Sequence, residues 1–303
     1  MKILYPLTYA LLYLLSLLPW RVLYAISDAL FIPIYHWFRY RRRVVEQNLR
    51  ESFPEKSEKE RRDIERRFYH FLCDYAIEVV KLFSISKKNM MRHMEFTGVD
   101  EVRAALERED KKFCFLYLGH YCNWEYVASL QYWLPEIHCG QIYHRLYNHV
   151  FNRLFLHIRG QFGGENILMK ETFQRILHLR REPKRVMIGF IADQAPGWES
   201  MHQWTTFLHH DTSFFIGTER IGKMVDAAIY YVNIERVRRG YYKASFKLLS
   251  MHPSTLPDYE LTNTYAHYLE AQIQAEPAYW LWSHKRWKRT KEEWLRRHQA
   301  EAS

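Results

Sequence analysis

The sequence predicts an α/β fold, with a mixed, largely parallel sheet flanked by helices behind an N-terminal membrane-anchoring helix. Short apolar runs alternate with helix-period segments along most of the chain, as in proteins whose parallel strands are linked by helices. The run from Phe113 to Leu118 has the length and composition of a strand buried on both faces. An uncharged apolar stretch from Ile3 to Trp20 reaches the lower length limit for a helix that crosses a bilayer.

The first 45 residues are expected to anchor the protein in a membrane. A second apolar segment, residues 22–38, ends in a cluster of arginines: Arg39, Arg41, Arg42 and Arg43. By the positive-inside rule, this cluster places the rest of the chain in the cytoplasm. We therefore expect residues 1–45 to form an anchor with a basic juxtamembrane segment, and residues 46–303 to form one cytoplasmic domain. Prolines interrupt both apolar segments, so a buried hairpin of core helices is the alternative.

The rest of the chain predicts helices and strands in alternation. Ser57 and Glu60 form a capping box, and apolar residues recur at helical spacing up to Leu82, which predicts a long helix. We then expect a strand at 113–118, a helix from Asn123, a short strand near 141–143 and a helix at 148–158. The alternation continues through residues 166–169, 172–179, 185–192, 214–226, 228–234 and 242–249.

Composition narrows the class of partner. The chain has 303 residues, is 48% hydrophobic and 26% charged, and is therefore globular. Its formal net charge of +10 implies an anionic partner, and leaves nucleic acid, anionic lipid and an acidic carrier protein open. The ten Trp, 22 Tyr and 18 Phe suit either a membrane interface or an aromatic core. Four cysteines without a CxxC pair indicate reduced thiols in a cytosolic compartment.

Polar residues gather directly after three predicted strands, where open α/β sheets bind their ligands. The three groups are His120 with Glu125, Arg145 with Asn148, and Asp193 with Gln194. If Asn123 caps the following helix, Glu125 lies in its first turn and His120 on the preceding loop, so the imidazole can fold back toward the carboxylate. A neutral imidazole oriented by a carboxylate can deprotonate a hydroxyl, which then attacks an activated acyl group. Arg145 would hold a phosphate or stabilise the oxyanion. On this pattern alone, the histidine and the acid can also be structural.

At these residues the sequence resembles a known family. The block Gly119–Glu125 looks like the motif of a histidine, four residues and an acid that marks the lysophospholipid acyltransferase superfamily, in the glutamate form typical of lipid A biosynthesis (lauroyl and myristoyl) acyltransferases. Four further blocks follow in the family's order: Tyr143–Asn148, Asp193–Gln194, Phe207–Thr212 and Pro277–Trp287. The segment Asn48–Pro54 also fits the region after the family's anchor. The resemblance covers nearly the whole chain.

The resemblance implies a glycerolphosphate-acyltransferase-like fold and an enzyme of the bacterial inner membrane whose catalytic domain faces the cytoplasm. Such enzymes transfer a fatty acyl chain from acyl carrier protein to a hydroxyl of a lipid A precursor, with no cofactor and no metal. The implied partners are acyl carrier protein, the lipid A precursor and anionic membrane lipid. By motif position, His120 is the general base and Glu125 its orienting partner. The resemblance also implies a substrate-binding set: Arg145, Asn148, Asp193, Gln194 and Asn123.

The chain departs from the family pattern at two places. His144 and Leu146 alter the Tyr143–Asn148 block, and His209–Asp211 replaces a glycine-containing loop. These differences leave another glycolipid or an aminolipid open as the acceptor. A non-catalytic basic membrane protein that binds anionic lipid is the alternative function. A hydrolase is a weaker one, because the chain has no GxSxG nucleophile elbow.

Three other segments can be considered for a metal site, a nucleophile and a binding surface. The side chains of His209–Asp211 alternate in direction in an extended segment, so we expect no metal site there. Cys122 could be considered as an acyl-accepting nucleophile, although the motif gives its position no role. The aromatic and cationic residues of Trp280–Arg289 suit a lipid headgroup interface better than nucleic acid, because the chain has no nucleic-acid-binding motif.

Overall fold

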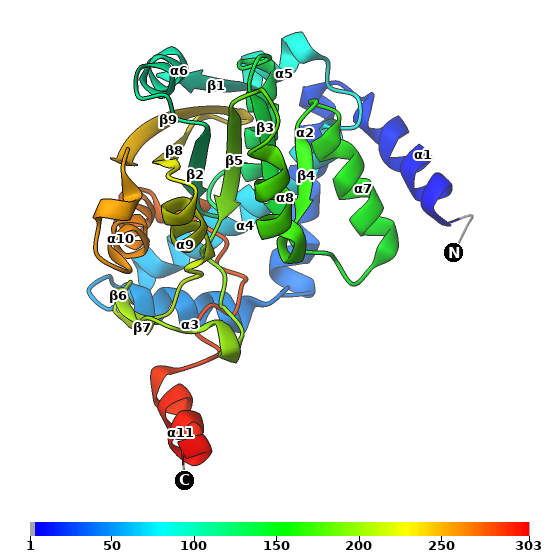
Figure 1. Ribbon diagram of the computed structural model, residues 1–303. Coiled ribbons are helices and arrows are strands. Elements are labelled where there is room, and N and C mark those ends of the chain that lie inside the picture. The colour runs from blue at the N-terminus through cyan, green and yellow to red at the C-terminus, as the bar shows by residue number, and fades with distance from the viewer. Residues whose placement is uncertain (1–3, 303) are drawn as a thin grey trace.

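The computed structural model describes residues 4–302 and has a seven-stranded mixed sheet at its centre (Figure 1). The strand order is β1-β9-β8-β2-β5-β3-β4, and every neighbouring pair is parallel except β8 with β9. The strands are β1 (Met94–Thr97), β2 (Phe113–Leu118), β3 (His138–Tyr143), β4 (Glu165–Leu168), β5 (Val186–Ile191), β8 (Ala228–Arg238) and β9 (Tyr241–Ser250), with β6 (Thr205–Phe207) and β7 (His210–Thr212) in a separate hairpin. The predicted mixed, largely parallel sheet is confirmed.

Helices cover the sheet and form both ends of the part of the chain that the structure describes. They are α1 (Leu4–Ser16), α2 (Trp20–Ile32), α3 (Arg42–Ser52), α4 (Glu58–Lys81), α5 (Lys87–His93), α6 (Val99–Arg108), α7 (His149–Gly160), α8 (Thr172–Leu179), α9 (Gly217–Met224), α10 (Glu260–Ala275) and α11 (Lys291–Ala302). Shorter turns lie at Pro33–Trp37, Trp124–Tyr132, Met169–Glu171, Trp198–Ser200, Pro253–Thr255 and Pro277–Tyr279. The capping box that starts α4 forms as the sequence predicts, with Ser57 and Glu60 each accepting from the other's backbone.

Strand β2 is the centre of the core, and all six of its residues are buried. It lies between β5 and β8, so alternate side chains must pack against two different layers. Tyr117 stacks on Tyr265 of α10, with ring centroids 4.5 Å apart. Leu116 and Leu118 instead line a cavity beneath the helix Trp124–Tyr132. The continuous apolar run is thus explained by burial on both faces.

The segment after β2 differs from the sequence prediction. Residues Trp124–Tyr132 form a 3₁₀ helix, and Asn123 does not cap it. The side chain of Asn123 is fully buried and donates to Oε2 of Glu78 in α4 (2.8 Å). Glu78 also accepts from Tyr242 (2.7 Å) and from Tyr24 (3.1 Å). A buried carboxylate requires such donors, and this requirement outweighs the capping preference of asparagine.

The N-terminal helices only partly match the predicted anchor. Within the described residues, no single helix is long and apolar enough to cross a membrane, although Leu4–Ser16 and Trp20–Trp37 qualify as a pair bent by 113°. Ile3, where the predicted anchor begins, lies outside the described residues. Helix α2 packs on α4, and Ser27 donates to Asp74 (2.7 Å). Helix α1 lies beside α7 at one edge of the molecule, whereas α11 projects from another end (Figure 1).

Candidate active site

His120 and Asp193 are brought together by the parallel register of β2 and β5. Leu118 pairs with Ile191 at the carboxyl ends of the two strands, so the second residue beyond each end lies beside the other. The backbone N–H of His120 donates to Asp193 Oδ2 (2.8 Å), and its Nδ1 donates to Oδ1 (2.6 Å). Two hydrogen bonds from one residue to one carboxylate fix the orientation of the imidazole.

Asp193 is a buried carboxylate that keeps its charge. Its side chain is 2% exposed, and it accepts a third hydrogen bond from Nε1 of Trp280 (2.8 Å). Burial alone would raise the pKa of Asp193, but the charge of His120 and the hydrogen bonds from His120 and Trp280 outweigh burial and lower the pKa to about 2. Asp193 is therefore negatively charged at neutral pH and favours the histidine tautomer with its proton on Nδ1.

The second ring nitrogen of His120 is available as a base. Its Nε2 lies 3.3 Å from Nε2 of Gln194, whose amide N–H can donate to it. The ring of Trp124 packs edge-on against the imidazole, with centroids 5.0 Å apart, and His120 retains 17% exposure. A neutral imidazole with a carboxylate behind Nδ1 and an accessible Nε2 can accept a proton from a bound hydroxyl.

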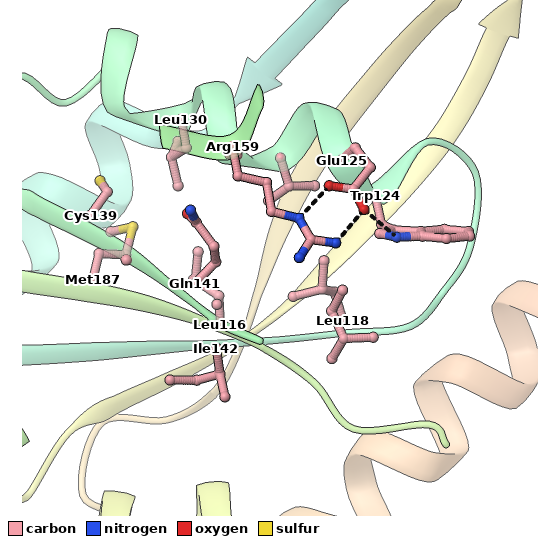
Figure 2. A pocket seen from close by; sticks show the side chains of 15 residues that line it. Leu116, Leu118, Trp124, Glu125, Leu130, Cys139, Gln141, Ile142, Arg159 and Met187 are labelled. Carbon is pink, nitrogen blue, oxygen red and sulfur yellow. Dashed lines mark hydrogen bonds and ion pairs between the residues drawn. The ribbon is translucent and has the colours of Figure 1, made fainter. Parts of the chain in front are cut away.

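Glu125 does not contact the imidazole, so the predicted pairing of Glu125 with His120 is wrong. Both oxygens of its carboxylate are bound by Arg159 of α7, Nε to Oε2 at 2.6 Å and Nη2 to Oε1 at 2.5 Å (Figure 2). Nε1 of Trp124 also donates to Oε1 (3.2 Å). The Glu125 side chain is 2% exposed, and a carboxylate so buried requires a cationic partner. The local motif suggested a local contact, whereas the sheet supplies Asp193 from 73 positions away.

The C-terminal block holds the turn that carries His120. Two backbone hydrogen bonds join the two segments and form an isolated bridge between Tyr121 and Trp280: Leu281 N–H donates to His120 O (3.1 Å), and Cys122 N–H donates to Tyr279 O (2.9 Å). Trp280 and Trp282 are 3% and 0% exposed. The expectation that these tryptophans lie at a lipid headgroup interface is therefore wrong, because they form part of the support of the site.

Sequence reasoning missed two residues that shape the site. Arg159 gave no signal, since its partner Glu125 is 34 positions away on a different element. His284 lies in the C-terminal block, but its contact is visible only in the fold: its Nε2 accepts from the backbone N–H of Ala195 (3.3 Å). Burial lowers the pKa of His284 to about 4, so this ring stays neutral and remains an acceptor.

A largely apolar cavity lies next to this cluster. It lies between strands β2, β3 and β5 and the 3₁₀ helix Trp124–Tyr132, and it is partly open to solvent. Its apolar lining includes Leu116, Leu118, Val127, Ala128, Leu130, Ile142, Met187 and Ile191. The Glu125–Arg159 pair and Gln141 supply its polar side chains (Figure 2). A cavity with apolar walls and a few charged groups suits a ligand with a hydrocarbon chain and a polar end.

Comparison with known proteins decides the family. Over residues 2–289, the chain matches the family described as bacterial lipid A biosynthesis acyltransferase. The chain belongs to this family. A search of curated proteins finds no matching relative. Membership indicates an acyltransferase of lipid A biosynthesis, and it confirms the resemblance found in the ordered motif blocks.

The structure separates the other predicted substrate-binding residues of this acyltransferase from the histidine. Arg145 is exposed after β3, at the same sheet edge as His120, but it makes no hydrogen bond to His120 or Asp193. The Asn148 side chain caps α7, where Oδ1 accepts from Val150 N (2.9 Å) and Phe151 N (3.2 Å). Asn123 is buried against Glu78, as described above. Of the predicted set, only Asp193 and Gln194 contact His120.

The segment His209–Asp211 and the thiol of Cys122 were the other candidates that the sequence offered for chemistry. Within residues 4–302, no cluster of three or more His, Cys, Asp or Glu residues could hold a metal ion. His210 stacks on Trp287, with ring centroids 3.9 Å apart. Cys122 is fully buried, and burial raises the pKa of its thiol well above its usual value. A buried, protonated thiol is a poor nucleophile, so Cys122 reads as a core residue.

Proposed function

We propose that this protein transfers a fatty acyl chain from acyl carrier protein to a hydroxyl of a lipid A precursor, with His120 as the general base. The observation that carries the proposal is the pair of hydrogen bonds from His120 to Asp193, which engages Nδ1 and leaves Nε2 facing Gln194 beside an apolar cavity. Family membership supports the reaction class and the lipid A-type substrate. The proposed transfer uses no cofactor.

In the proposed mechanism, Nε2 of His120 removes the proton of the acceptor hydroxyl as its oxygen attacks the thioester carbonyl. A tetrahedral intermediate forms, and its collapse breaks the carbon–sulfur bond. The imidazolium returns its proton to the leaving thiolate, so the products are an ester and the free carrier thiol. Asp193 remains ionised throughout and stabilises the transient positive charge on His120.

The cavity is proposed to hold the acyl chain. Its apolar walls would bury the hydrocarbon, each methylene contributing about 0.8 kcal/mol. Glu125 and Arg159 lie on its wall as a buried ion pair, and we assign Glu125 the role of a positioning residue that fixes Arg159 and the 3₁₀ helix beside His120. Arg145, at the same sheet edge, is proposed to contact the anionic acceptor.

We propose that the first 45 residues bind the bacterial inner membrane and that the remaining domain faces the cytoplasm. Leucines on the outer side of α1 remain unusually exposed: Leu7 at 66%, Leu11 at 65% and Leu14 at 64%. Trp37 and Phe38, before the arginine cluster, are 74% and 77% exposed. Exposed leucines and aromatic rings of this kind suit a lipid interface.

The proposal is tested with the purified full-length protein in detergent, an acyl carrier protein loaded with a fatty acid, and a lipid A precursor. Mass spectrometry should detect one added acyl chain, and His120→Ala should abolish transfer while binding to phosphatidylglycerol vesicles persists. Vesicle binding by a wild-type protein that moves no acyl chain would favour the alternative, a non-catalytic basic membrane protein.

A further inference from the structure

A cationic surface lies beside the candidate active site and is assembled from both ends of the chain. This basic patch consists of Arg39, Arg41 and Arg43, which line one hollow of the surface together with Glu46, and of Lys285, Lys288 and Arg289. All are exposed except Arg289, which is half-buried. Arg41 joins the two halves, because its Nη1 donates to the carbonyl of Ser283 (3.0 Å). The fold therefore unites cations that are more than 240 positions apart in the sequence.

No carboxylate among the described residues forms an ion pair with the basic patch, and Glu46, which lies beside its arginines, pairs with Arg42 (3.1 Å). Among residues 4–302, none of its six cations forms an ion pair, whereas Arg42 in the same run pairs with Glu65 (2.6 Å). The pKa of Lys288 is lowered by burial and then by the charges of Arg289, Lys285 and Arg41. Like charges held close together without an ion-pair partner create a positive potential that attracts an anionic partner.

The N-terminal half of the basic patch is held in a defined conformation. Arg39 and Arg41 have φ angles of 49° and 52°, in the left-handed region that residues other than glycine seldom adopt. They follow the π-helical turn Pro33–Trp37 and precede α3. Such conformations persist only where the surrounding structure imposes them. The guanidinium groups therefore extend from a fixed backbone.

The C-terminal half of the basic patch lies close to His120, the proposed general base. Nη1 of Arg289 donates to the carbonyl of Pro196 (3.0 Å), and His284, next to Lys285, accepts from Ala195. Ala195 and Pro196 directly follow Gln194, whose amide lies 3.3 Å from Nε2 of His120. A partner bound on the basic patch would therefore lie next to the strand end that forms the site.

We propose that the basic patch docks an acidic acyl carrier protein, so that the thioester it carries is delivered to His120. The inference rests on the proposed function and deepens it by assigning the surface used by the acyl donor. An acidic carrier complements six unpaired cations, and such complementarity accelerates encounter and fixes the orientation of the partners.

A carrier protein fits the basic patch better than the bilayer does. Membrane interfaces combine cations with exposed aromatic rings, yet Trp280 and Trp282, which precede Lys285, are buried. Exposed aromatic rings flank only the N-terminal half of the basic patch, at Trp37, Phe38 and Tyr40, whereas the half formed by Lys285, Lys288 and Arg289 has no exposed aromatic neighbour in the C-terminal block. The basic patch thus lies at the boundary of the proposed membrane face, where a water-soluble carrier can approach.

The test measures binding of fluorescently labelled acyl carrier protein, with its phosphopantetheine arm attached, to the full-length protein in neutral detergent. The variant carries Arg39→Glu, Lys285→Glu and Lys288→Glu. We expect its affinity for the carrier to fall at least tenfold, and we expect wild-type affinity to decline steeply with added salt. Carrier affinity equal to wild type, or wild-type binding insensitive to salt, would overturn the proposal.

The matched control reverses three exposed cations at the opposite edge of the sheet: Arg180→Glu, Arg181→Glu and Lys184→Glu. These changes alter net charge equally and should leave carrier affinity unchanged. Both triple variants are also tested on vesicles of phosphatidylcholine and phosphatidylglycerol. If the patch variant loses vesicle binding and keeps carrier affinity, the surface binds lipid and the proposal fails.

Failure of the docking proposal is distinguishable from failure of the proposed function. His120→Ala should bind the carrier normally and transfer nothing, because the basic patch is intact. If the wild type transfers acyl chains but the patch variant retains its kcat/KM for the loaded carrier, docking is refuted and the proposed function stands. If the carrier binds through the basic patch and no chain is transferred, the proposed function fails instead.

Discussion

Two buried carboxylates near His120 have different surroundings and hence different tasks. Asp193 accepts from His120 and Trp280, and its charge faces the imidazole. Glu125 accepts two hydrogen bonds from Arg159, and its negative charge is neutralised by that guanidinium group. Only the first arrangement fixes the tautomer of the histidine, so we assign orientation of the base to Asp193 and positioning of the neighbouring wall to Glu125.

A substitution at Gly119 tests how precisely His120 and Asp193 must be held together. A Cβ there would lie 2.6 Å from Cδ1 of Leu269 and 3.3 Å from Oδ2 of Asp193. Since Leu269 is fully buried, Gly119→Ala should displace the loop and weaken the His120–Asp193 contact. A shift of about 1 Å can lower kcat on the order of 100-fold. Steady-state transfer assays check this, with Gly197→Ala as the control because no atom lies within 4 Å of its Cβ.

Glu78 gives a prediction about pH. Burial raises its pKa to about 7, outweighing hydrogen bonds from Asn123 and Tyr242. The folded protein thus favours the protonated form of Glu78, and this preference stabilises the fold fully below the unfolded-state pKa near 4.5. The stabilisation is lost as the pH rises through the folded-state pKa of about 7. Glu78→Gln should remove this loss, which amounts to about 3 kcal/mol. Urea unfolding at pH 5 and pH 8 checks it; equal losses in both proteins would contradict it.

The sequence predicted His120 as a candidate base but did not predict the carboxylate that its imidazole contacts. The spacing to Glu125 made a local pair plausible, and no property of Asp193 itself pointed to the histidine. The contact depends on β5 lying next to β2 with Leu118 opposite Ile191. Strand order and register result from packing of the whole chain, so a pattern read along one segment cannot supply them.

At the scale of elements, the ion pair between the 3₁₀ helix and α7 forms one wall of the cavity. Removing one partner leaves the other charge buried and unpaired, so Glu125→Gln should destabilise the protein by about 3 kcal/mol. Glu125→Gln combined with Arg159→Met removes both charges and should recover part of that loss. Chemical denaturation of the wild type, of Glu125→Gln and Arg159→Met alone, and of the double variant measures the coupling. If the double variant is as unstable as the sum of the single variants, the pair does not act as described.

Strand β5 offers a second test, of the proposed acyl pocket. Gly189 lines the cavity, and a Cβ there would meet nothing closer than 3.8 Å, so a larger side chain fits the strand and fills the cavity. Gly189→Val should favour shorter acyl donors, with a loss of about fourfold in kcat/KM for each methylene excluded. Competition between loaded carriers of different chain length measures this preference. Gly197→Val is the matched control, and an unchanged preference in Gly189→Val would place the chain elsewhere.

The helices and strands were predicted correctly where the spacing of apolar residues alone determines them. The strand 113–118 and the helix 172–179 match β2 and α8, and the Ser57 cap starts α4 as expected. The helix expected from Asn123 is a 3₁₀ helix, because buried Glu78 takes the asparagine side chain. Tertiary contacts thus override local preference at the turn that carries the motif.

At the scale of the whole molecule, the chain separates apolar and cationic surfaces. Exposed leucines lie on α1, and the cations of the basic patch come from segments far apart in the sequence and lie beside the end of the sheet that carries His120. The net charge of +10 indicated an anionic partner. The sequence could not show that residues 39–43 and 285–289 share one surface, because only the fold brings Arg41 to Ser283.

The central claim, that Asp193 orients His120 as the general base, is tested most directly by single-turnover acyl transfer with Asp193→Asn. Asparagine can donate to Nδ1 and hold the wrong tautomer, so we predict a rate on the order of 10⁴-fold below wild type, with the fold retained by circular dichroism. A rate within about threefold of wild type would contradict the account, because a base that needs no buried carboxylate is not the one described.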